Sequence, residues 1–247
     1  AWMTDNFVKL NEDKTELIVV GSPHMLARIP PVQVKLGNAV ITPSDSSRNL
    51  GVVFDHKMEL ADHVTSVCRS CTYHLHRIGQ IRKFLSEEAT KKVVHALVIS
   101  RLDYCNSVLH GLPKMTLCKL QHIQNSAARM VKRVKKSEHV SPVLEDLHWL
   151  PVQKRVVFKI CTLVYNCLNE ENMPSYLCDV ISLYTPPRDL RSAHSVLLKC
   201  AQVKTKRWGD RAFCAAAPRL WNSLPDELRA APSLSTFKRG LKTYLFS

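Results

Sequence analysis

The spacing of apolar residues changes once along the chain, from short runs to long stretches with helical periodicity. Short apolar runs predict strands at residues 16–20, 32–36, 39–41 and 49–54. Gly37-Asn38, between the second and third of these runs, is a typical two-residue hairpin turn. Residues 1–11 predict the end of a helix. From Leu60 onward the period is helical and predicts helices at residues 60–85, 87–109, 115–135, 142–147 and 152–169.

The longest stretch of unbroken helical patterning runs from Ser86 to Lys136. In its second half, one side of the predicted helix carries the apolar residues Leu117, Leu120, Ile123, Ala127, Val131 and Val134. The other side carries the polar residues Asn125, Arg129, Lys132, Arg133 and Lys136. The first half is apolar over a wider arc, as is typical of a helix buried among other helices. Because Gly can end one helix and Pro can begin the next, Gly111-Leu112-Pro113 predicts the turn of a helical hairpin.

The remainder of the chain is less regular. Ser137–Pro151, with a polar start and two prolines, predicts a junction, and Tyr184–Ser192 predicts a second loop. The other patterns predict a strand at 196–203, a helix at 210–222 that includes Pro218, and a last helix from 233 to 246 that Ser233 caps.

These patterns together predict a mainly α fold with a small β unit (α+β). Short antiparallel strands are expected to precede a helical bundle and an α-rich carboxy-terminal region. The expected domains are residues 1–59, 60–136 and 137–247.

Positive charge is concentrated in the middle of the chain. The 247 residues include 35 Lys and Arg against 21 Asp and Glu, a formal net charge of +14. Residues 1–62 carry 6 basic and 8 acidic residues, residues 63–136 carry 14 and 3, and residues 137–247 carry 15 and 10. A positive field on helices predicts a polyanionic partner, and we expect nucleic acid rather than a membrane, because no amphipathic segment has the aromatic-rich apolar face of a membrane-surface helix. A basic protein with solvated lysines is the alternative.

The nine cysteines are odd in number, scattered and mostly inside apolar helical patterns. This usage predicts reduced thiols in a cytoplasmic or nuclear protein that is not secreted. No signal peptide is recognised at the start, and no uncharged run approaches the roughly 18 residues of a membrane span. The chain begins with Ala1 rather than Met, which predicts a fragment of a longer protein.

Side chains of metal-ligand type cluster in the first long predicted helix. They are His63, Cys68, Cys71, His74 and His76. At 100° per residue, Cys71 and His74 share the side of the apolar stripe, and no second Cys-x-x-Cys or His-x-x-x-His completes a set of four ligands. We therefore expect a helix contact and no metal site here, with a zinc module as the alternative.

A basic stripe lies on the opposite side of the same helix. Arg69, His76 and Lys83 recur every seven residues within roughly 40° of one another, a spacing that suits a phosphate backbone. A solvated surface is the alternative interpretation. With their basic neighbours these residues form the candidate nucleic-acid-binding set: Arg69, His76, Arg77, Lys83, Lys91, Lys92, Arg129, Lys132, Arg133 and Lys136.

The motifs of common enzyme classes do not occur. We find no G-x-S-x-G, G-x-x-x-x-G-K, G-x-G-x-x-G or H-E-x-x-H. Glu87-Glu88 lies at a predicted helix start, where the helix dipole favours negative charge, so it does not indicate catalysis. Trp149 and Trp221 lie in apolar-rich segments, which favours core packing over base stacking.

Seven segments in a fixed order carry a family resemblance. They are Lys9–Gly21 (KLNEDKTELIVVG, preceded by Trp2-Met3 and Asn6), Asn49–Asp55 (NLGVVFD), His63–Cys71 (HVTSVCRSC), Leu97–Pro113 (LVISRLDYCNSVLHGLP), Leu120–Val131 (LQHIQNSAARMV), Leu144–Val156 (LEDLHWLPVQKRV) and Gly209–Pro225 (GDRAFCAAAPRLWNSLP). The series resembles the carboxy-terminal part of the reverse transcriptases of non-long-terminal-repeat retrotransposons of the jockey-like and chicken-repeat-like groups. It covers the chain essentially from end to end.

The resemblance implies roles for the segments. The first would belong to the last palm motifs, Asn49–Asp55 to the primer grip, and the helices after it to the thumb that holds the template–primer duplex. It implies that Lys14 is a general acid for the pyrophosphate leaving group, with an ordinary surface lysine as the alternative. It also implies that the carboxylates that hold two Mg²⁺ ions lie upstream of Trp2. We therefore expect this chain alone to bind no cofactor and to be inactive in polymerisation.

The expected function is that of a carboxy-terminal fragment of a retrotransposon RNA-directed DNA polymerase. It would contribute template–primer backbone binding without the catalytic aspartates. The implied partners are RNA, an RNA–DNA duplex and the upstream fingers and palm of the same polyprotein. The alternative is a degenerate or co-opted helical module for protein interaction, without nucleic-acid activity.

Overall fold

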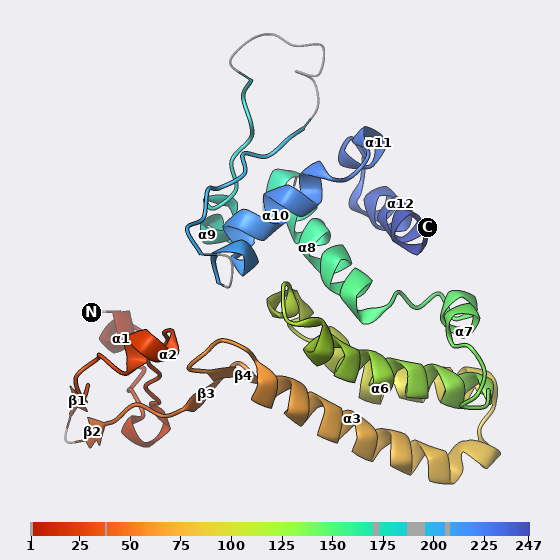
Figure 1. Cartoon of the computed structure of the whole chain (residues 1–247), viewed down its shortest axis with the longest axis horizontal. Coiled ribbons are helices and arrows are strands. Elements are labelled where there is room, and N and C mark those ends of the chain that lie inside the picture. The colour runs from red at the N-terminus through yellow and green to blue at the C-terminus, as the bar shows by residue number, and fades with distance from the viewer. Residues whose placement is uncertain (1, 38, 170–172, 187–195, 206–207) are drawn as a thin grey trace. The chain divides into compact units, whose positions relative to one another are not determined.

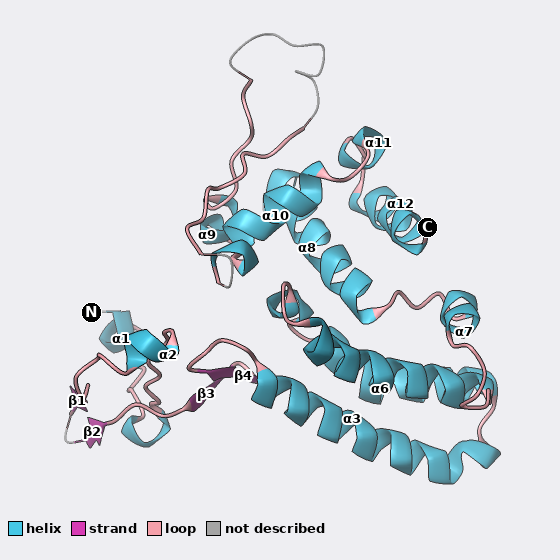
Figure 2. Ribbon diagram, viewed as in Figure 1, coloured by secondary structure: helices cyan, strands magenta, loops and turns pink. Residues whose placement is uncertain are grey.

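The structure is a computed structural model that describes residues 2–37, 39–169, 173–186, 196–205 and 208–247. It divides into two compact units, Ala1–Ser66 and Val67–Ser247. The described chain is mainly helical and carries two small antiparallel sheets in its first unit (Figure 1, Figure 2). The predicted class, mainly α with a small β unit, is confirmed. The predicted boundaries after residues 59 and 136 stay predictions.

The first unit contains the predicted hairpin. Strand β1 (Val34–Leu36) pairs antiparallel with β2 (Ala39–Ile41), so that Leu36 lies opposite Ala39. Gly37 supplies the left-handed backbone of the turn with φ of 57°, a conformation that glycine adopts without strain. Asn38, the other predicted turn residue, lies outside the described residues.

The strand predicted at residues 49–54 is wrong, because this segment contains a turn. Strand β3 (Ser46–Asn49) pairs antiparallel with β4 (Val52–Asp55). Leu50 and Gly51 connect them with φ of 46° and 84°. Two successive left-handed residues match the twist of a two-residue hairpin, so the segment supplies a turn and a second strand rather than one strand.

One further prediction for this unit is wrong, and another holds over fewer residues than expected. Residues 16–20 form no strand and make a single bridge, between Leu17 and Pro43, because no neighbouring segment continues the pairing. The helix expected within residues 1–11 is helical only at α1 (Trp2–Asp5), since Phe7 has a left-handed backbone with φ of 55°. The unit also contains the 3₁₀ turn η1 (Glu12–Lys14) and the short helix α2 (Pro23–Leu26).

Asp55, at the end of β4, orders the loop that precedes the long helix α3 (Ala61–Ile81). Its carboxylate accepts hydrogen bonds from the backbone N–H groups of Lys57, Glu59 and Leu60. These bonds shape the loop that leads into the helix, because a carboxylate that accepts backbone N–H groups orders them. Helix α3 then continues into the second unit and ends at Ile81, before the residue 85 at which the predicted helix ends.

The helix predicted at residues 87–109 begins correctly and ends early. After the 3₁₀ turn η2 (Arg82–Phe84), α4 (Glu87–Val94) starts where the Ser86 hydroxyl accepts from the N–H of Ala89 at 3.1 Å. One π-helical turn, η3 (His95–Ile99), leads into α5 (Ser100–Asp103). The helix ends there because Tyr104 is extended and Cys105 is left-handed with φ of 49°. Asn106–Leu109 forms the 3₁₀ turn η4.

Helix α6 (Lys114–Lys132) confirms the predicted helical hairpin. It follows Pro113, and Gly111 has the left-handed φ of 70° that the turn needs. The helix ends before the predicted residue 135, because Arg133 is left-handed with φ of 56° and the N–H of Val134 returns to the carbonyl of Arg129 at 3.1 Å. Val134 therefore follows the helix instead of continuing its apolar stripe.

The remaining helices largely follow the apolar pattern. Four of them match predicted helices: α7 (Ser141–Asp146), α8 (Val152–Asn169), α10 (Phe213–Asn222) and α12 (Leu234–Phe246). The Ser233 hydroxyl caps α12, as predicted, by accepting a hydrogen bond from the N–H of Thr236. The strand predicted at 196–203 is wrong, since its described pairing is one bridge between Leu183 and Leu198. Of the predicted loop 184–192, residues 187–192 lie outside the described residues. The short pieces α9 (Ser175–Cys178), η5 (Gly209–Arg211) and α11 (Asp226–Arg229) complete the chain.

Helix α8 forms the centre of the second unit and packs against α6, α10 and α12. Phe237 of α12 stacks on Tyr165 of α8 with ring centroids 4.6 Å apart and lies 5.6 Å from Trp221 of α10. Trp221 is 0% exposed and Trp149 is 5% exposed, so the prediction that both tryptophans pack in the core is confirmed. Within the described residues, no helix has the length and apolar character that crossing a membrane requires.

Candidate nucleic-acid interface

The carboxyl ends of α3 and α6 lie together in the second unit (Figure 1). Helix α3 buries Cys71, Leu75 and Ile78, which follow one another at four and three residues and so share one face. Helix α6 buries the small residues Ala127 and Ala128, which allow close helix packing. Several basic residues of the two helices are exposed, among them Arg69 and Arg77 of α3 and Lys114 and Lys119 of α6.

Arg82 joins the two helix ends. Its Nε and Nη2 atoms donate to the carbonyls of Met130 (2.8 Å) and Val131 (2.7 Å), and Nη1 donates to the carbonyl of Leu85 (2.8 Å). The last carbonyls of a helix have no partner within it and lie at the negative end of its dipole, so a guanidinium stabilises them. Arg82 therefore caps α6 from outside.

A groove of about 580 Å³ opens next to this cap. Its walls come from α3, η2, α6 and the segment that follows α6. Of the ten residues that line it, four are basic and none is acidic: Gly79, Arg82, His122, Asn125, Ser126, Arg129, Met130, Arg133, Val134 and Lys136. We call this surface the basic groove.

The guanidinium groups of the basic groove are close enough to repel one another. Arg133 donates from Nη2 to the carbonyl of Arg82 at 3.3 Å. Burial, followed by the positive charge of Arg133, lowers the pKa of the Arg82 guanidinium, while Glu87 acts in the opposite direction. An anion in the groove would relieve this repulsion.

Arg129 contributes an unused donor to the same wall. Its Nη2 donates to the carbonyl of Glu138 at 3.0 Å, which holds the side chain in place. Its Nε is buried and has no hydrogen-bond partner among the described residues. A buried N–H without an acceptor is costly, and an acceptor oxygen supplied by a ligand or by water removes that cost.

Only some residues of the predicted set line the basic groove. Arg129, Arg133 and Lys136 do so. Arg69, His76 and Lys83 are exposed, and His76 and Lys83 lie three residues before and four residues after the groove residue Gly79, so they flank it along α3 and η2. Arg77 is also exposed, but the helical period turns it to the opposite side of α3.

Three predicted residues have other neighbours. Lys132 forms ion pairs with Glu87 and with Asp146 (2.6 Å), which connects α6 to α4 and α7. Hydrogen bonds to Asp146 and Glu87 raise the pKa of the Lys132 ammonium. Lys92 is exposed and pairs with Glu88 at 2.7 Å, and Lys91 is half-buried on the same helix. The charges of Lys132 and Lys92 are therefore partly balanced by carboxylates.

Seven lining residues are missing from the predicted set: Gly79, Arg82, His122, Asn125, Ser126, Met130 and Val134. His122 lies seven residues before Arg129, so helical spacing alone places it on the same face. Arg82 lies four residues after the buried Ile78, and a charged residue on an apolar stripe indicates a cation that needs acceptors inside the fold. Both signals are present in the sequence.

The predicted cluster of metal-ligand types is not gathered into a ligand set. Among the described residues, no group of three or more His, Cys, Asp or Glu side chains is placed to hold a metal ion. Burial raises the pKa of the Cys71 thiol to about 11, and its Sγ lies 3.8 Å from the carbonyl of Val98. In the first unit, the N–H of Val53 lies 3.5 Å from Nδ1 of His63, and burial with the charge of Arg48 lowers the pKa of this histidine.

Lys14, the residue with the implied general-acid role, ends η1 in the first unit. Its side chain is exposed, and the preceding turn is capped by the Asn11 side chain, which accepts from the N–H of Asp13 at 3.1 Å. Lys14 thus lies on a 3₁₀ turn rather than at the start of a strand.

Comparison with protein-family models, with curated proteins and with solved structures found no significant match.

Proposed function

We propose that the second unit grips the phosphate backbone of RNA or of an RNA–DNA duplex through the basic groove, as the carboxy-terminal part of a non-long-terminal-repeat retrotransposon reverse transcriptase. One observation carries the binding proposal: four basic and no acidic residues line a groove of about 580 Å³. The link to a reverse transcriptase rests on the ordered segments of the sequence.

The chemistry of the groove suits phosphate better than bases. Guanidinium groups match the geometry of phosphate oxygens and bind them through pairs of N–H donors. Arg129 and Arg133 supply such donors, and Lys136 adds a point charge that is exposed at the rim. Flanking Arg69, His76 and Lys83 extend the positive surface along α3 and η2. Contacts of this type position a backbone and carry no sequence information directly.

The proposal contains no catalytic step. No residue of this chain is assigned to Mg²⁺, which the resemblance implies only for an intact polymerase. The general-acid role of Lys14 likewise belongs to such an intact enzyme. The function proposed for this chain is binding.

A salt titration with matched variants tests the proposal. The chain is titrated into a fluorescently labelled RNA–DNA duplex, and anisotropy is measured between 50 and 200 mM salt. Affinity should fall steeply with salt, because bound Lys and Arg release counterions. The double variant Arg133→Gln with Lys136→Gln should bind about tenfold more weakly and reduce the salt slope by about 2.

The control removes the same charge elsewhere. Arg77→Gln with Lys114→Gln changes two exposed residues that do not line the basic groove, and it should keep at least half of the affinity. Equal losses in both double variants would show a diffuse charge effect. Salt-insensitive or undetectable binding by the unmodified chain would contradict the proposal and favour a module for protein interaction.

A further inference from the structure

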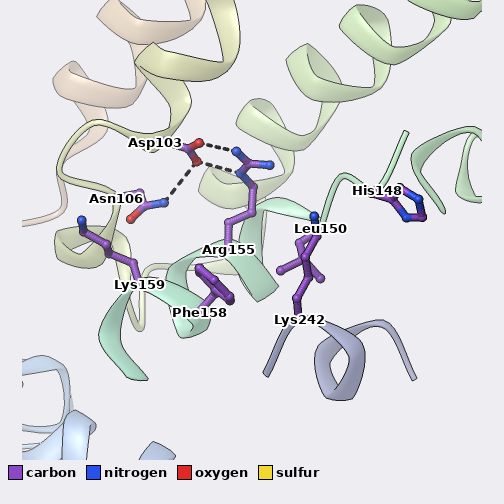
Figure 3. Close-up of a pocket in the computed structure, with 8 residues that line it drawn as sticks. All are labelled: Asp103, Asn106, His148, Leu150, Arg155, Phe158, Lys159 and Lys242. Atoms are coloured by element: carbon purple, nitrogen blue, oxygen red, sulfur yellow. Dashed lines mark hydrogen bonds and ion pairs between the residues drawn. The ribbon is translucent and has the colours of Figure 1, made fainter. Parts of the chain in front are cut away.

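A second pocket, of about 310 Å³, lies elsewhere in the second unit and shares no lining residue with the basic groove. Its walls come from α5, η4, α8, α12 and the segment before α8. The polar side chains that line it are Asp103, Asn106, His148, Arg155, Lys159 and Lys242 (Figure 3).

Asp103 and Arg155 form the fixed wall of the pocket. The Arg155 Nε donates to Oδ1 of Asp103 at 2.7 Å, and Nη2 pairs with Oδ2. The Asn106 amide donates to Oδ1 of the same carboxylate at 3.4 Å. The only carboxylate among the lining residues is therefore neutralised. The third guanidinium nitrogen, Nη1, is left over and points away from Asp103 in Figure 3.

Two lysines add positive charge that no carboxylate balances. Among the described residues, neither Lys159 nor Lys242 has an ion-pair partner. Figure 3 shows the Lys242 ammonium on the side of Arg155 Nη1, next to Leu150, whereas Lys159 points the other way, beyond Asn106. Burial lowers the pKa of Lys242, and the nearby positive charges of Arg155 and Lys91 lower it further.

Asn106 adds a sign of a missing partner. The residue is 4% exposed, and its Oδ1 atom is buried without any hydrogen-bond donor among the described residues. Its amide nitrogen is already committed to Asp103, so the orientation of the side chain is fixed. Buried acceptors without a partner are rare in folded proteins, and one at a pocket wall indicates a donor that arrives with a ligand or a water molecule.

We propose that this pocket binds a phosphoryl group, held between Nη1 of Arg155 and Nζ of Lys242. Three cationic side chains line the pocket against one carboxylate that is already paired, so the lining carries an excess of positive charge that favours an anionic group such as phosphate. Lys159 and Asn106, at the other side of Arg155, suit the polar remainder of a small phosphate monoester. The inference does not rest on the proposed nucleic-acid function, because the two sites have no residue in common.

Isothermal titration calorimetry of the full chain in 150 mM NaCl tests the proposal, with inorganic phosphate and ribose 5-phosphate as the two probes. Both probes present the same phosphoryl group. Tighter binding of ribose 5-phosphate would identify a phosphate monoester as the ligand, whereas equal binding of the two probes would identify free phosphate. Lys242→Gln should weaken binding about tenfold or more, the value of one charge-assisted contact. Lys238→Gln, which removes the same charge from an exposed position of α12, should leave it unchanged.

The proposal is overturned if neither probe binds, or if the two lysine variants lose affinity equally. A measurement on the unmodified chain covers the case in which Lys242→Gln fails to fold. In a nuclear magnetic resonance titration of lysine side chains, added phosphate should raise the pKa of Lys242 while the Lys238 resonance keeps its position. If the pKa of Lys242 did not change when phosphate was added, the site would be excluded as well.

Discussion

Arg82 and Arg133 are neighbours at the end of α6, yet their guanidinium groups have different roles. Arg82 uses all three nitrogens on backbone carbonyls, so its charge belongs to the fold. Arg133 is exposed and, within the part of the chain that the structure describes, its side chain makes one long hydrogen bond, so most of its donors are available to a ligand. The basic groove therefore contains arginines that stabilise its walls and arginines that can bind a ligand. The first kind uses its donors on backbone carbonyls, and the second kind leaves most of its donors unused.

Replacing Arg82 by Met should destabilise the second unit without a large change in side-chain volume. The change leaves the carbonyls of Met130 and Val131 without their donor, and the expected loss of unfolding free energy is about 2 kcal/mol. Urea denaturation followed by circular dichroism measures it. Lys83→Met is the control at the adjacent exposed residue and should change stability by less than about 0.5 kcal/mol. Equal effects of the two changes would remove the capping role of Arg82.

The sequence predicts exposure of single residues better than it predicts their partners. Helical spacing correctly places Arg69, His76 and Lys83 on an exposed face. It does not reveal that Lys132 pairs with Glu87 and Asp146, because these carboxylates are distant in sequence and meet it only when α4, α6 and α7 pack together. Which basic side chains remain available to a ligand therefore depends on tertiary packing and cannot be predicted from local sequence.

Helices with a clear apolar stripe are predicted well, and short pairing segments are not. The bounds of α8 agree with the predicted ones, because its apolar stripe is the face that packs against neighbouring helices. Helix α12 begins after its predicted cap, Ser233, because the cap and the apolar stripe indicate the same start. The helix expected to reach residue 109 stops at Asp103, since a left-handed Cys105 has no signature in the apolar pattern. The strands predicted at residues 16–20, 49–54 and 196–203 fail for a similar reason, because pairing depends on which segment lies alongside, whereas the β1–β2 hairpin is predicted by its own turn residues.

The contact of α8, α10 and α12 depends on one aromatic ring. Phe237 is fully buried and touches both Tyr165 and Trp221, so Phe237→Ala should lower the free energy of unfolding by about 3–5 kcal/mol. Thermal unfolding followed by tryptophan fluorescence measures the change, because Trp221 reports on this contact. Phe84→Ala removes the same ring from an exposed position and should have little effect. Unchanged stability of Phe237→Ala would show that α12 contributes little to the core.

Considered as a whole, the chain distributes its charge unevenly along its length. The first 62 residues carry a small acidic excess, whereas residues 63–136 carry 14 basic and 3 acidic residues. This distribution and the fold class follow from the sequence alone. The grooves do not, since they depend on how helices that are far apart in sequence pack.

The charge distribution predicts where nucleic acid touches the chain. Ultraviolet cross-linking of an RNA that contains 4-thiouridine, followed by mass spectrometry of the peptides, should place most cross-links within residues 67–136. Few are expected in residues 1–62, because their negative excess repels phosphate. Cross-links concentrated in the first unit would contradict the assignment of binding to α3 and α6.

The π-helical turn η3 makes one helix sensitive to its own length. A π turn holds one residue more than an α turn, so it rotates the side chains that follow by about 100°. Asp103 lies four residues beyond this turn, and its pairing with Arg155 forms a wall of the phosphate pocket. Loss of one residue from η3 would give a regular helix that aims Asp103 away from Arg155. A single deletion in η3 would therefore change which way the side chains of α5 face, while the helical secondary structure would remain.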